Sequence, residues 1–119
     1  GLSDFFDMVR TVPLEHTVSH LLEKYGEKVG PIEAPSGSSD VGNVSYRCPA
    51  IQPLIAVTEK NMALHTVDFR NACRTDRAHQ AMLSGAAVLT ELFLKVYNEP
   101  DFAQNVQETW KASLNQKKG

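Results

Sequence analysis

One histidine, His65, stands where a side chain could bind a metal ion. It follows the apolar residues 62–64 and precedes a short segment, residues 66–69, so we expect it on a loop at the end of a strand, where α/β proteins place their ligands. Zinc needs three or four convergent donors, and a lone histidine is ordinarily a hydrogen-bonded core or surface group. Asp68, three residues on, is either a partner of that imidazole or a solvated turn carboxylate.

A second candidate is Asp40, which lies in a polar turn formed by residues 37–45. In such a Gly- and Ser-rich turn the carboxylate can cap nearby backbone N–H groups, which is the usual habit of aspartate in turns. The alternative is that Asp40 orients a substrate or a metal ligand. The turn alone leaves both interpretations open.

The remaining metal-binding side chains give weaker signals. His16 and His20 are one helical turn apart and could chelate zinc, but they lack the acidic residue of an HExxH helix and a third donor. His79 lies near a helix start, where the dipole disfavours a cation, so we expect it to be neutral. Cys48 and Cys73 have no paired spacing and are predicted to be reduced, partly buried thiols.

Other catalytic motifs are missing from the sequence. It contains no His-x-Asp pair, no adjacent glutamates, no glycine-rich phosphate loop and no Gly-x-Ser-x-Gly elbow. No complete catalytic site is therefore visible.

The elements that would position these residues include four predicted helices. A short helix is expected over residues 3–9 and a second over 13–25, with Pro13 at its start and Gly26 as its stop. The strongest helical periodicity spans residues 76–97, and its small-residue centre predicts that it lies flat on a sheet at Gly85. A last helix begins near residue 98 and should dock through a stripe of apolar residues, Phe102, Val106 and Trp110.

Between these helices we predict a long loop and two strands. Residues 26–42 are rich in Gly, Pro and Ser and have no periodicity, which indicates a loop. Residues 43–47 and 51–58 have β-like composition, and Pro53 favours an edge position for the second strand. Two strands are marginal by themselves, so further strands would have to come from elsewhere.

The length and the composition predict a soluble protein with a single domain. The 119 residues carry a net charge of −2, with 42% hydrophobic and 22% charged residues. No block of like charge indicates nucleic-acid binding, and no apolar run approaches the roughly 20 residues of a membrane span. The N-terminus has no signal-peptide pattern, so we expect a cytoplasmic protein.

Three segments, in this order, resemble a known family. The turn GSSDVGNVSYRCP, the tripeptide LHT and the helix AHQAMLSGAAVL with the following NEPDF are similar to blocks in the C-terminal part of the catalytic domain of di-zinc aminoacylase-like metallopeptidases. The nearest branch is the aminobenzoyl-glutamate hydrolase type. The resemblance covers residues 37–102. Thr66, Asn43 and Ala81 depart from the family's Ser, Asp and Gly, which bears on substrate class more than on fold.

The resemblance implies an α/β fold: a few β-strands packed with about four helices, as the C-terminal portion of a zinc-peptidase-like catalytic domain. Residues 1–26 would be a helical lead-in and residues 27–119 the catalytic-domain part of a single-domain fragment. His65 would take the place of the family's last metal-binding histidine. Asp40, with its neighbour Ser39 and with Thr66, would lie at the substrate pocket.

The same resemblance implies the cofactor and the activity. Family members bind two ions, usually zinc, and hydrolyse an amide bond in an N-acyl amino acid, a dipeptide or an aminobenzoyl-glutamate-like substrate. The other ligands belong to an upstream catalytic half that this chain lacks, so the isolated chain is expected to be inactive and to hold no zinc tightly.

A second hypothesis is a non-enzymatic helical module for protein–protein interaction or homodimerisation. It is motivated by the apolar stripe at Phe102, Val106 and Trp110 and by the paired N-terminal helices, either of which could face another chain.

Overall fold

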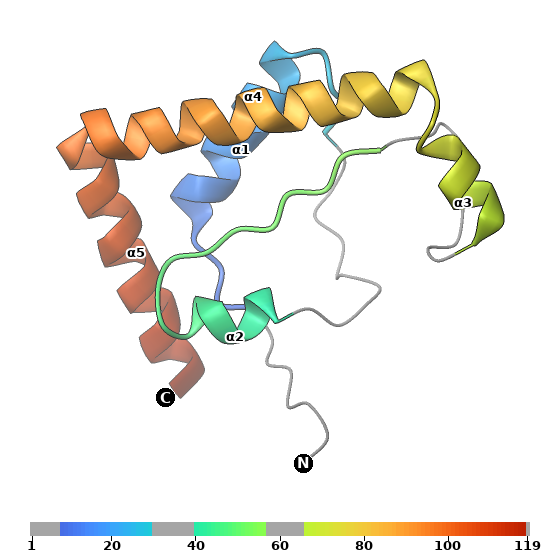
Figure 1. Ribbon diagram of the computed structural model, residues 1–119. Coiled ribbons are helices and arrows are strands. Elements are labelled where there is room, and N and C mark those ends of the chain that lie inside the picture. Colours follow the sequence, from blue (N-terminus) through green and yellow to red (C-terminus); the bar gives the residue numbers. More distant parts are fainter. Residues whose placement is uncertain (1–7, 30–39, 57–65, 119) are drawn as a thin grey trace.

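The computed structural model describes residues 8–29, 40–56 and 66–118, and in that part of the chain every regular element is a helix. The helices are α1 (Val12–Lys24), α2 (Val41–Ser45), α3 (Val67–Ala72), α4 (Asp76–Asn98) and α5 (Pro100–Lys118). Figure 1 shows α4 running across the molecule, with α5 turning away from its C-terminal end and α3 at its N-terminal end.

Helix α1 has the boundaries that its punctuating residues predicted. Pro13 occupies the first turn, where its missing N–H would have no intrahelical partner. At the other end Gly26 adopts a left-handed φ of 80°, and the N–H of Glu27 returns to the carbonyl of Leu22 at 2.9 Å. That conformation costs glycine little, so the helix stops here. Of the helix predicted over residues 3–9, only Met8 and Val9 are described, and they are not helical.

The core lies where α1, α4 and α5 pack on one another. Its buried members come from all three helices: Leu14, Val18, Leu22, Val88, Leu92 and Val106. Phe102 packs against this cluster, Val106 belongs to it and Trp110 is buried, so α5 docks through the predicted stripe. Helix α1, which lies in the predicted lead-in of residues 1–26, therefore shares one core with α4 and α5.

The predicted α/β fold is wrong for the described residues. Residues 43–47 form most of α2 and the turn after it, and residues 51–56 are extended but pair with no strand; residues 57 and 58 lie outside the described part. In α2 the backbone bonds locally: the N–H of Val44 donates to Asp40 at 3.2 Å and that of Cys48 to Val44 at 3.1 Å. A strand needs a neighbour to pair with, and without one these local bonds satisfy the same groups.

The close approach predicted at Gly85 has a different cause from the one we expected. A Cβ built on Gly85 would lie 3.2 Å from Cδ1 of Ile55, so the extended segment of residues 51–56 packs on α4 at this point. The small residue admits a side chain from a single extended segment, and no sheet covers α4 there among the described residues.

Candidate functional site

The carboxylate of Asp40 is solvent-exposed at the N-terminus of α2. Asp40 is the N-cap residue of that helix, with φ −71° and ψ −11°, yet its side chain makes no capping hydrogen bond. These dihedrals are helical, whereas a capping aspartate normally has extended ones. The capping interpretation of Asp40 is therefore wrong in this structure.

Thr66 does cap a helix. Its Oγ1 accepts a hydrogen bond from the N–H of Phe69 at 3.2 Å, with the extended dihedrals φ −112° and ψ 161° that a cap requires. The hydroxyl group assigned to a substrate pocket thus has a structural task at the start of α3. Neither the pattern nor the resemblance had indicated this capping role.

The two described members of the predicted pocket lie on separate helices. Asp40 is at the start of α2 and Thr66 at the start of α3, and Figure 1 shows these helices far apart in the molecule. The structure does not bring the two side chains together. Ser39 and the predicted metal ligand His65 lie outside the described residues, so the complete set remains a prediction.

The other donors do not form a zinc site by themselves. His16, His20 and His79 are exposed, and nowhere in residues 8–29, 40–56 and 66–118 do three or more His, Cys, Asp or Glu side chains gather closely enough to hold a metal ion. Since zinc takes three or four protein ligands, the described donors alone do not fit it. Cys48 and Cys73 are free thiols, and both are exposed instead of partly buried.

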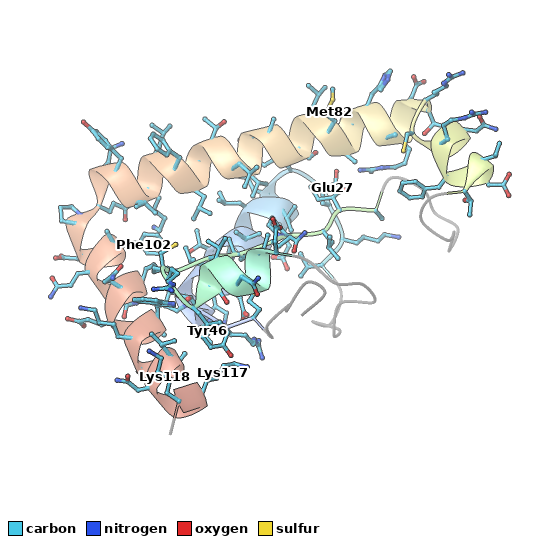
Figure 2. All side chains as sticks on the ribbon, turned by 60° about the horizontal axis from the view of Figure 1, so that its bottom comes forward. Glu27, Tyr46, Met82, Phe102, Lys117 and Lys118 are labelled. Atoms are coloured by element: carbon cyan, nitrogen blue, oxygen red, sulfur yellow. The ribbon has the colours of Figure 1, made fainter. Side chains whose placement is uncertain are left out.

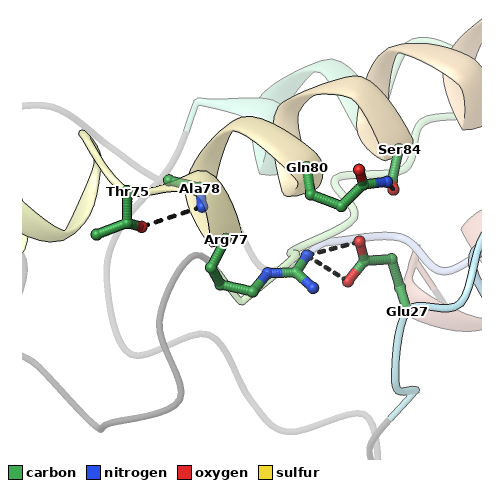
Figure 3. A network of polar contacts seen from close by, with 6 residues as sticks. All are labelled: Glu27, Thr75, Arg77, Ala78, Gln80 and Ser84. Atoms are coloured by element: carbon green, nitrogen blue, oxygen red, sulfur yellow. Dashed lines mark hydrogen bonds and ion pairs between the residues drawn. The ribbon is translucent and has the colours of Figure 1, made fainter.

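A partly buried ion pair that the sequence did not predict joins the end of α1 to the start of α4. Nη2 of Arg77 lies 2.6 Å and 2.7 Å from the two carboxylate oxygens of Glu27, and Figure 3 shows the two side chains pointing toward one another. Glu27 is only 8% exposed. The Arg77 guanidinium, helped by the Ser84 hydroxyl, holds the pKa of the Glu27 carboxyl below its usual 4.5, although burial opposes this.

A second charged cluster borders a shallow groove between α1 and the C-terminal end of α4. Lys24 and the hydroxyl of Tyr25 both donate to the carboxylate of Glu91, at 2.7 Å and 2.6 Å, and Lys95 pairs with Glu99 at 3.1 Å. Leu21, Leu94 and Asn98 complete the lining. Because these charges are paired with one another, the groove has no feature that selects a charged ligand.

The Glu27–Arg77 pair predicts how stability depends on pH. The pKa of Glu27 is lowered in the folded state. The ionised carboxylate therefore stabilises the fold fully at pH values above the pKa that Glu27 has in the unfolded chain, and this stabilisation is lost as the pH falls through the pKa of the folded state. We expect the midpoint temperature of unfolding, measured by circular dichroism, to decrease as the pH is lowered from about 6 to about 3. Glu27→Gln should lower the midpoint at neutral pH and flatten this dependence.

Glu99→Gln is the matched control, because the Glu99 side chain is 54% exposed and its pair with Lys95 is on the surface. Its midpoint should follow that of the unmodified protein. A Glu27→Gln variant with an unchanged acid dependence would show that this ion pair does not contribute.

No known protein-family profile matches the chain. Its sequence is nevertheless similar to part of a peptidase. That relative is the human Xaa-Arg dipeptidase: 31% of residues are identical over 83 positions, which is 70% of this chain and 19% of the dipeptidase. The chain thus spans about one fifth of the length of the relative that it matches. None of the helices in the described part combines the length and the hydrophobicity of a membrane span.

Proposed function

We propose that this chain is part of a metal-dependent peptidase or amidohydrolase, to which it contributes one metal-binding histidine. The observation that carries the proposal is the similarity to a dipeptidase over 83 residues. The ordered motifs at residues 37–49, 64–66 and 78–89 support the same class through their resemblance to zinc aminoacylase-like enzymes, although they lie in the same sequence as that match.

In this proposal the zinc ligands come from two separate stretches of polypeptide. The described donors do not gather into a group of three, so His65 is proposed as one ligand, and the others would come from residues beyond this chain. When bound, the two zinc ions would lower the pKa of a water molecule, which would make it a better nucleophile toward an amide carbonyl at neutral pH. The part played by this chain would be to hold one imidazole nitrogen on the metal and to keep it neutral.

Among the candidate substrates, a dipeptide with a C-terminal arginine is the one that the relative's name supports. An N-acyl amino acid or an aminobenzoyl-glutamate-like amide has the same scissile bond, so each is a comparison substrate.

A chimera tests the proposal directly. The 83-residue part of the human dipeptidase that matches this chain is replaced by the matching residues of this chain, and zinc content and hydrolysis of an Xaa-Arg dipeptide are measured. We expect a folded chimera that binds zinc at the level of the intact dipeptidase and retains hydrolysis. A folded chimera with neither property would contradict the proposal, as would sub-micromolar zinc binding and hydrolysis by this chain alone.

A further inference from the structure

We draw no further inference here: the strongest candidate, the exposed apolar side of helix α4 on which Figure 2 shows Met82 facing away from α2, carries nothing, because nothing in the described part of the structure shows what covers it.

Discussion

Replacing Trp110 by alanine is expected to lower the free energy of unfolding by about 3–5 kcal/mol, the range for removing a large buried aromatic side chain. Trp110 is 7% exposed, and its Nε1–H donates to the carbonyl of Ser45 at 2.6 Å. This hydrogen bond joins α5 to α2. The hydroxyl of Ser45 in turn accepts from the N–H of Val9 at 2.8 Å and donates to the carbonyl of Gly42, so Ser45 links the indole both to α2 and to the segment before α1.

Two further variants separate packing from hydrogen bonding. Trp110→Phe keeps an aromatic ring but leaves the Ser45 carbonyl without its donor, which should cost about 1–3 kcal/mol. Gln107→Ala, an exposed position on the same helix, should change stability by less than about 0.5 kcal/mol. Urea unfolding followed by circular dichroism measures all three. A Trp110→Ala variant as stable as Gln107→Ala would mean that α5 does not dock as described.

Helices with strong local signals were predictable from the sequence. The first-turn proline and the terminal glycine bounded α1, and the apolar repeat of residues 76–97 located α4, because both signals act within a few residues. The stripe at Phe102, Val106 and Trp110 identified the docking face of α5 for the same reason. Periodicity also showed that α4 was apolar, but it could not separate the side facing the core from the side left exposed.

The strands were wrong because a strand is not a local property. Val44, Ile51 and Ile55 are residues that sheets favour, yet sheet propensity depends on neighbours more than helix propensity does. In residues 41–48 the backbone satisfies its own hydrogen bonds within one turn. Residues 41–45 of the motif GSSDVGNVSY therefore form a short helix in this chain, whatever the motif contributes to the family that it resembles.

The candidate site was only partly predictable, since residues distant in sequence decide its geometry. Nothing near Glu27 indicates that Arg77, fifty positions away, pairs with it. The threonine that precedes α3 could have been recognised as an N-cap from its position before a helix. Its assignment to a substrate pocket came from resemblance alone, which reports motif order and not the distance between side chains.

In the dipeptidase chimera, His65→Ala is expected to lower kcat/KM for an Xaa-Arg dipeptide by at least about 100-fold. Loss of groups that merely orient a metal ligand already costs 10–100-fold, and loss of the ligand itself should cost more. The fall should appear in kcat, and the zinc content measured by atomic emission should drop by one ion per chain. If His65 instead contacts the substrate, KM rises and the zinc content stays unchanged.

His79→Ala is the matched control for that experiment, because His79 is an exposed histidine on α4 within the same stretch of sequence. It should leave both zinc content and kcat/KM within about twofold of the chimera, as expected of a surface side chain away from the reaction. Excess zinc should restore part of the activity of His65→Ala, since a weakened site still fills by mass action. Full zinc occupancy and full activity in His65→Ala would remove the histidine from the metal site, and with it the proposed contribution of this chain to the peptidase.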